Sequence, residues 1–179
     1  MKILKKLGIG ILAIVAILLI VAVFIKKEYA VEREVSINKP LADVFAYVRN
    51  IKNQNYYSVW NLKDPNSKQD FKGTDGTVGF IASWDSKNDE VGQGEQEIKN
   101  IVEGSRIDME LRFTRPFKAT DQGYLITESV NENQTKVKWG FTGKMDYPMN
   151  LMLVLMDMEG MIGNDMQAGL TNLKNILEK

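Results

Sequence analysis

The sequence predicts an α+β protein in which one N-terminal transmembrane helix precedes a domain with an antiparallel sheet and a long C-terminal helix. Three observations lead to this prediction. Residues 7–25 form an uninterrupted apolar run. Apolar residues then recur at every second position through much of residues 78–144, and a helical period returns over residues 147–177. A sheet with one apolar face needs a covering layer, which the last helix can supply.

The apolar run has the length of a membrane-spanning helix. Its 19 residues contain no charged or polar side chain and can cross a bilayer core of about 30 Å. A cleaved signal peptide is one alternative, but its apolar region is usually about 7–15 residues, and Val23, Phe24 and Ile25 are too bulky for its cleavage site. A buried core helix is the other alternative, which the flanking lysines disfavour. We therefore interpret residues 1–27 as an anchor and residues 28–179 as the folded domain.

Composition excludes several classes of function. The chain has no Cys and no His, so it cannot contain a Ser-His-Asp triad, a thiolate nucleophile or a His- or Cys-ligated metal site. We expect no metal and no cofactor. Residues 1–27 hold five lysines and no acid, which leaves 18 basic against 23 acidic residues in the domain. That balance argues against nucleic acid as a partner. The lysines before the run slightly favour an inside N-terminus and an extracytoplasmic domain.

The first half of the domain reads as a strand followed by helices. Residues 29–37 are rich in β-formers and predict a strand. Asn38 or Lys39 would cap the next helix, with Pro40 in its first turn. This helix has one apolar face, which consists of Leu41, Val44, Phe45 and Val48. Residues 51–60 predict a short second helix or an irregular link, and Pro65, Gly73 and Gly76 predict a loop.

The second half reads as strands followed by one helix. Strands are predicted over residues 78–84, 91–102, 106–113, 123–130 and 135–144. The strand over residues 106–113 is the clearest, because four apolar residues alternate with Arg106, Asp108, Glu110 and Arg112. We interpret those four charges as a solvated face. Residues 147–177 predict one long helix, kinked near Gly160 and Gly163.

The order of these elements resembles a known superfamily. The resemblance is carried by the following segments: Asn38-Lys39-Pro40, Val44-Phe45, Trp60 with Asp64-Pro65, Gly76 to Trp84, Gly92-Gln93-Gly94, Leu111 to Pro116, and Thr135 to Trp139. They span residues 31–177, and the pattern is similar to the helix-grip fold of the START-like (SRPBCC) superfamily, in its polyketide cyclase/dehydrase and lipid-transport branch. The resemblance implies a curved antiparallel sheet of about six or seven strands around the C-terminal helix, with a cavity between them. The membrane anchor is not part of the common pattern.

Apolar residues on the predicted inner faces are the candidate ligand contacts. Met145, Met149, Met152 and Met156 recur at helical spacing, and methionine suits surfaces that accept varied apolar shapes. Packing of the core is the alternative for this stripe and for the tryptophans. The predicted ligand-binding residues are Trp60, Trp84, Met109, Leu111, Phe113, Trp139, Phe141, Met149, Met152 and Met156.

Chemistry would require a carboxyl or a tyrosine that faces the cavity. Glu95, Glu97 and Glu128 are the candidate catalytic residues, with a solvated strand face as the alternative. Gly92-Gln93-Gly94 has no following helix, so it does not indicate a dinucleotide site. The predicted function is a membrane-anchored binding domain for a hydrophobic small molecule or lipid. The alternatives are a cyclase, dehydrase or hydrolase acting on a polyketide-like or lipid substrate, and an interaction module without a ligand.

Overall fold

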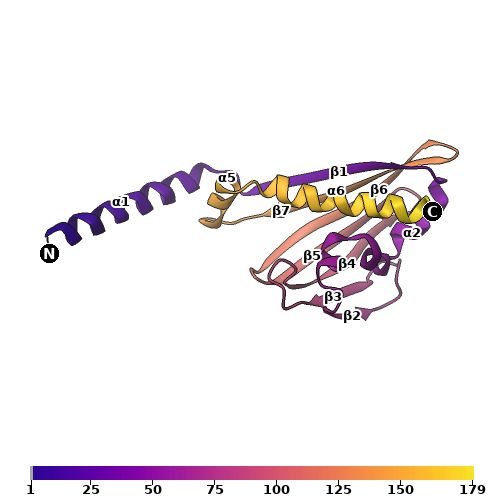
Figure 1. Cartoon of the computed structure of the whole chain (residues 1–179), viewed down its shortest axis with the longest axis horizontal. Coiled ribbons are helices and arrows are strands. Elements are labelled where there is room, and N and C mark those ends of the chain that lie inside the picture. The colour runs from indigo at the N-terminus through magenta and orange to yellow at the C-terminus, as the bar shows by residue number, and fades with distance from the viewer. Residues whose placement is uncertain (1) are drawn as a thin grey trace.

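A computed structural model describes residues 2–179, with the backbone alone at Lys2 (Figure 1). The N-terminal helix α1 (Lys2–Phe24) projects from one end of the domain, and its side chains are almost all exposed. Within the described residues, its segment Ile3–Phe24 is the one helix long and apolar enough to cross a membrane. The apolar helix expected at the N-terminus is therefore present, and its length is that of a candidate span.

The domain is built on one seven-stranded sheet in which every pairing is antiparallel. The strand order is β1-β7-β6-β5-β4-β3-β2, so β2 to β7 are neighbours in the order of the sequence and β1 pairs with β7. The strands are β1 (Glu28–Ile37), β2 (Lys68–Lys72), β3 (Ile81–Asp85), β4 (Gln93–Val102), β5 (Arg106–Arg115), β6 (Ala119–Asn131) and β7 (Gln134–Lys144). This arrangement confirms the predicted antiparallel sheet of six or seven strands.

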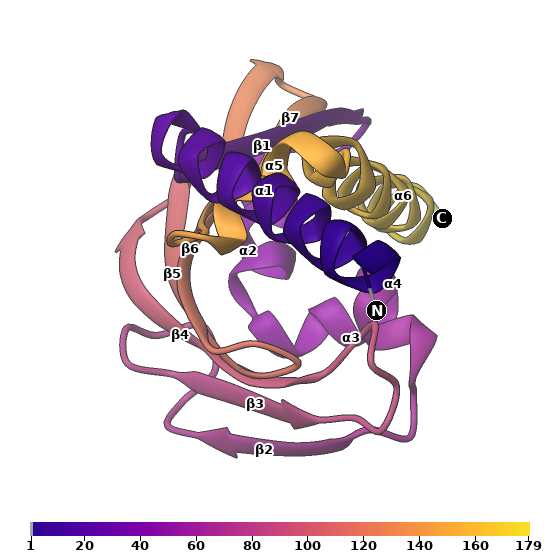
Figure 2. The ribbon, with the colours of Figure 1, turned by 90° about the vertical axis from the view of Figure 1, so that its left-hand side faces the viewer.

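Helices cover the concave face of this sheet (Figure 2). The longest is α6 (Met158–Leu177), which packs mainly against β1. The shorter elements are α2 (Leu41–Arg49), η1 (Ile51–Asn53), α3 (Gln54–Tyr57), α4 (Val59–Lys63), η2 (Met149–Leu151) and α5 (Met152–Leu155). The link expected over residues 51–60 is thus a series of short helical turns that continues to Lys63. Together the sheet and α6 form the helix-grip arrangement that the sequence pattern predicts.

Alternation along the strands decides which side chains enter the core. On β5, Ile107 and Met109 are fully buried, whereas Arg106 and Asp108 lie on the outer face and pair with each other at 2.7 Å. The buried residues gather at the end of the domain where α2, η1 and the C-terminal half of α6 meet the sheet. On α6 the buried large residues are Met166, Leu170 and Leu173, one face of the helix.

The single helix predicted over residues 147–177 is wrong. The chain forms η2 and α5, becomes extended at Met156 (φ −125°, ψ 141°), and starts α6 at Met158. The break lies at Met156 and Asp157, because the Asp157 carboxylate accepts the backbone N–H of Gly160 at 2.8 Å and caps the new helix. The kink expected at Gly160 and Gly163 is therefore displaced, and both glycines lie within α6.

Two strand predictions and one cap also differ from the structure. The strand predicted from Val78 begins only at Ile81, because Gly76 and Gly79 adopt positive φ (74° and 86°) and keep this segment in turns. Residues 68–72, expected as a loop, form the edge strand β2, whose exposed side chains leave no alternation to detect. Helix α2 has Pro40 at its N-cap and no side-chain cap, so neither Asn38 nor Lys39 caps it.

Close approach between α6 and the sheet depends on glycine at position 169. A Cβ at Gly169 would lie 2.9 Å from the Trp139 ring, which is buried, whereas a Cβ at Gly163 would meet the flexible end of Arg33. We expect Gly169→Ala to lower the free energy of unfolding by about 1–3 kcal/mol through overpacking. Gly163→Ala is the matched control and should be neutral or stabilising by up to about 1 kcal/mol, because alanine favours the helix.

Urea unfolding of the full chain in mild detergent, followed by tryptophan emission, measures both variants. Equal stability of the two variants would contradict a tight contact at Gly169.

Candidate cavity between the sheet and the C-terminal helix

A large cavity lies between the concave face of the sheet and the N-terminal half of α6. Its volume is about 1430 Å³, which exceeds the roughly 300–1,000 Å³ typical of small-molecule sites. The inner faces of β4 to β7 form its back wall, α3 and α4 close one side, and residues 145–162 close the other. The C-terminal half of α6 packs onto the core, whereas Met158 and Met161 in its first turns line the cavity.

Methionine is the dominant side chain of this cavity. All eight methionines other than Met1 line it: Met109, Met145, Met149, Met152, Met156, Met158, Met161 and Met166. Four of them were predicted as a stripe on one helix, which is wrong, since they come from a loop, η2, α5 and the extended residue before α6. They reach the same cavity nevertheless, because this irregular segment runs along its rim. Methionine side chains can repack around ligands of different shape.

The ten residues proposed from the sequence as ligand contacts all line the cavity: Trp60, Trp84, Met109, Leu111, Phe113, Trp139, Phe141, Met149, Met152 and Met156. Trp139 lies at the centre of an aromatic cluster, with ring centroids 5.9 Å from Trp60 and 5.8 Å from Tyr57, both edge to face. Trp84 is held by its indole N–H, which donates to the Val91 carbonyl at 3.1 Å. That these residues bind a ligand stays a prediction.

The cavity also contains polar groups that the sequence did not single out. Asp121 on β6 is buried, and one carboxylate oxygen accepts the Lys144 backbone N–H at 3.1 Å. Burial raises the pKa of Asp121, although the backbone hydrogen bond opposes this. Burial, aided by the nearby Asp121 charge, also raises the pKa of Tyr29 to about 12. A ligand in the cavity therefore meets a buried carboxyl and a neutral tyrosine hydroxyl at one end.

Asp121 escaped the sequence analysis because the predicted strand began at residue 123. In the structure β6 begins at Ala119, so Asp121 shares the inward parity of Gly123 and Leu125. A second polar pair lies at the opposite wall, where the Gln96 side-chain N–H donates to Gln54 at 2.9 Å. Deeper still, the buried Tyr57 hydroxyl has no hydrogen-bonding partner among the described residues.

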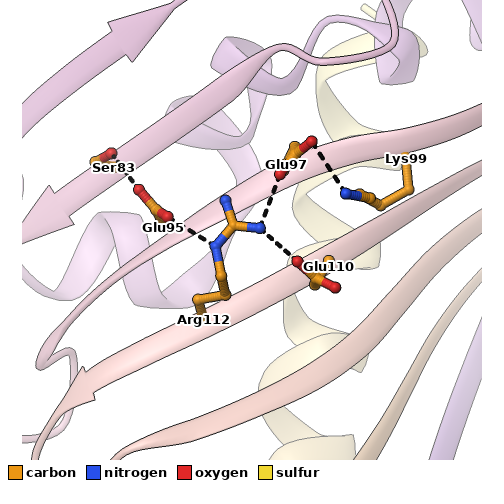
Figure 3. Close-up of polar contacts among 6 residues, drawn as sticks. All are labelled: Ser83, Glu95, Glu97, Lys99, Glu110 and Arg112. Atoms are coloured by element: carbon orange, nitrogen blue, oxygen red, sulfur yellow. Dashed lines mark hydrogen bonds and ion pairs between the residues drawn. The ribbon is translucent and has the colours of Figure 1, made fainter.

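The three glutamates proposed as catalytic are not among the residues that line the cavity, and Figure 3 shows two of them, Glu95 and Glu97, around Arg112. Glu95 and Glu97 are on the outer face of β4, where both accept hydrogen bonds from the Arg112 guanidinium, at 2.7 and 2.8 Å. Glu110 accepts a third. Glu128 is on the outer face of β6 and pairs with Lys138 at 3.0 Å. The side chains of all three are turned away from the ligand space by strand parity.

Charge on the outer face favours the ionised form of Glu97. Hydrogen bonds from Arg112 first, and from Lys99 second, lower the pKa of Glu97. A general acid needs the opposite shift, so among the carboxyls discussed Asp121 is the one with the properties of an acid–base group. Within residues 2–179 no three acidic side chains come together as a metal-binding cluster.

Solved structures share this fold at low sequence identity. A protein from Nitrosospira multiformis is 15% identical, with a TM-score of 0.56 over 83% of this chain and 96% of its own. Ara h 8.0201 is 14% identical, with a TM-score of 0.58 over 84% and 97%. DynU16, a putative protein in the dynemicin biosynthetic locus, is 12% identical, with a TM-score of 0.58 over 84% and 47%. No protein-family model and no curated protein matches the sequence.

Burial of Asp121 has a consequence for stability that can be measured. Because its folded-state pKa is raised, its ionisation destabilises the fold as pH increases from the ordinary value of 3.8 through the folded-state value. Asn cannot ionise and can still accept the Lys144 N–H. We expect the stability of Asp121→Asn relative to the native chain to increase with pH and then to level off.

Denaturant unfolding of both proteins at about pH 3 and about pH 7 tests this expectation. Asp70→Asn, at an exposed position of β2, makes the same exchange away from the cavity as a control. A stability difference that is the same at both pH values would contradict a buried carboxyl with a raised pKa.

Proposed function

We propose that this chain is a membrane-anchored binding protein that holds a hydrophobic small molecule or a lipid between its sheet and α6. One observation carries the proposal: a cavity of about 1430 Å³ whose walls contain eight methionines and all three tryptophans of the chain. An interaction module with a filled core would leave no void beside Met152, which is a wall residue of this cavity.

Burial of apolar ligand surface would supply the binding energy. At about 25 cal/mol per Å², a ligand that buries roughly 300 Å² gains about 7.5 kcal/mol before ordering costs. Aromatic edges from Trp60 and Trp139 and flexible methionines suit acyl chains and fused rings alike. Selectivity would come from the cavity shape and from the polar end at Asp121 and Tyr29, which can hydrogen-bond a hydroxyl or carbonyl of the ligand.

The N-terminal helix would keep this cavity at a membrane. Its segment Ile3–Phe24 spans about 33 Å at 1.5 Å per residue, enough for a bilayer core. The lysines before it favour a cytoplasmic N-terminus and an extracytoplasmic domain. Hydrophobic ligands concentrate in bilayers, so a tethered cavity meets them at high local concentration.

One observation favours a catalytic alternative, in which a polyketide-like or lipid substrate is cyclised or dehydrated. A carboxyl with a raised pKa faces the cavity beside a tyrosine, which is an arrangement for proton transfer. The place of DynU16, as a putative protein in a biosynthetic locus, is compatible with this chemistry. Under this alternative Asp121→Asn binds the ligand but loses turnover, whereas a pure carrier shows no turnover in either form.

Native mass spectrometry of the full chain, released from detergent micelles, tests ligand binding. We expect a stoichiometric bound mass that organic extraction identifies as a lipid or amphiphile. Leu111→Trp adds bulk to the cavity wall and should weaken the affinity for the ligand about tenfold, or about 1.4 kcal/mol. Gln122→Trp places the same ring on the exposed outer face as a matched control and should bind like the native chain.

An empty native protein that also fails to take up a panel of lipids and fatty acids would overturn the binding proposal. Equal loss of ligand in both tryptophan variants would show that the effect is not one of the cavity.

The anchor is tested separately by alkaline extraction of membranes that contain the full chain. We expect the protein to stay in the membrane pellet at about pH 11, because a spanning helix is held by its apolar length rather than by charge. Leu12→Arg combined with Val15→Arg puts two charges into the apolar run and should release the chain into the supernatant. Release of the native chain, or a mature N-terminus beyond residue 25, would contradict a retained anchor.

A further inference from the structure

The mouth of the cavity is surrounded by exposed apolar side chains. Phe117 in the β5–β6 connection is 69% exposed, and Tyr147, Met149 and Met161 are each about half exposed although they line the cavity. Beside them on α5, Val154 and Leu155 are each 68% exposed and lie outside the cavity wall. This apolar rim, defined by these six residues, occurs on three separate segments of the chain around one opening.

The anchor helix ends at the same side of the domain (Figures 1 and 2). Asn150 in η2 is fully buried, and its side-chain N–H groups donate to the carbonyls of Ala22 at 2.7 Å and of Ile25 at 3.0 Å. Ala22 is itself fully buried, whereas the other side chains described in α1 are exposed. Carbonyls in the last turn of a helix have no partner within the helix. Asn150 satisfies that of Ala22 and also binds that of Ile25, directly after the helix, so it attaches α1 to η2.

This attachment sets the height of the rim relative to the bilayer. α1 is about as long as the bilayer core is thick, so its last turn lies near the boundary between acyl chains and headgroups. Strand β1 starts at Glu28, four residues after α1 ends, and the Met145 N–H donates to the Lys27 carbonyl at 2.8 Å, which leaves no slack linker. η2 is bonded to residues inside the apolar run, so α5 directly after it lies at the membrane interface.

We propose that the apolar rim docks on the lipid bilayer beside α1, so that a ligand passes between membrane and cavity without crossing water. The inference rests on the proposed function, because it needs both the anchor and the binding cavity. A bilayer is the occupant that the structure favours, since the anchor already carries the rim to that surface. Inserted apolar side chains at an interface gain free energy in proportion to the area they bury. Asn150 acts as a positioning residue, because its hydrogen bonds to α1 fix the distance of the cavity mouth from the bilayer surface.

The absence of cysteine makes depth measurement direct. The full chain with Leu155→Cys, labelled with an environment-sensitive fluorophore, is reconstituted in phosphatidylcholine vesicles, and flotation first shows that it is inserted. Val130→Cys is the matched control, because Val130 is also exposed but lies on the β6–β7 hairpin at the opposite end of the domain. We expect iodide to quench the label at position 155 about tenfold less than the label at position 130, since inserted groups are shielded from water.

Equal quenching of the two labels by iodide would overturn docking even if the cavity binds a lipid. A chain that does not float with the vesicles would overturn the anchor and this inference with it. If the label at position 155 is shielded but the protein binds no ligand, the result would support docking on the bilayer and contradict the proposed function.

Transfer from the bilayer is measured with a nitroxide-labelled fatty acid, which quenches tryptophan emission on contact; all three tryptophans line the cavity. Val154→Asp combined with Leu155→Asp should slow quenching from vesicles about tenfold, because charges oppose insertion. Quenching by the same fatty acid in detergent should be unchanged, since neither residue lines the cavity.

Val102→Asp with Val130→Asp is the control on exposed valines away from the rim. Equal rates from vesicles in both double variants would overturn the proposed route.

Discussion

The approach of α6 to the sheet at Gly169 is the constraint on which the rest of the domain depends. Without a side chain at this position, the helix comes close enough for Trp139 of β7 to pack against its backbone. From this contact to the C-terminus the helix buries Leu170 and Leu173 in the core. Toward its N-terminus the helix still contacts Arg33 of β1 at Gly163, but the cavity opens beneath Met158 and Met161. One close contact therefore separates a packed half of the domain from a hollow half.

The hollow half combines an adaptable wall with a small polar end. Methionines from several segments and aromatic rings from the strands form most of the surface, so a ligand held there would make mainly apolar contacts. The buried Asp121 carboxyl and the Tyr29 hydroxyl are the exception. Charge elsewhere in the sheet is concentrated on the outer face, where Arg112 joins three glutamates.

The break between α5 and α6 links the cavity to the N-terminal helix α1. If residues 147–177 formed one straight helix, no segment would turn toward α1. Because the chain becomes extended at Met156, η2 and α5 lie across the end of the domain, where Asn150 bonds the last turn of α1. The buried Asn150 side chain thus holds η2 to the end of α1 by two hydrogen bonds.

The sequence by itself determined the elements whose side chains repeat with a clear period. The N-terminal apolar helix, the alternation of β5 with its charged outer face, and the inward residues of β7 all follow from spacing. So do the strand residues predicted to face the cavity, which are Trp84, Met109, Leu111, Phe113, Trp139 and Phe141. What only the tertiary structure decided lies where period carries no information. β2 is an edge strand with both faces exposed, and Asp157 ends one helix and begins another by a local hydrogen bond. Asp121 faces the cavity because pairing with β5 and β7 extends β6 beyond the residues that alternate in polarity. Glu95 and Glu97 point away from the cavity because their positions on β4 face outward, where they bind Arg112. Periodicity reports which face of an element is apolar, whereas strand pairing and capping depend on partners distant in the chain, and these set where each element begins and ends.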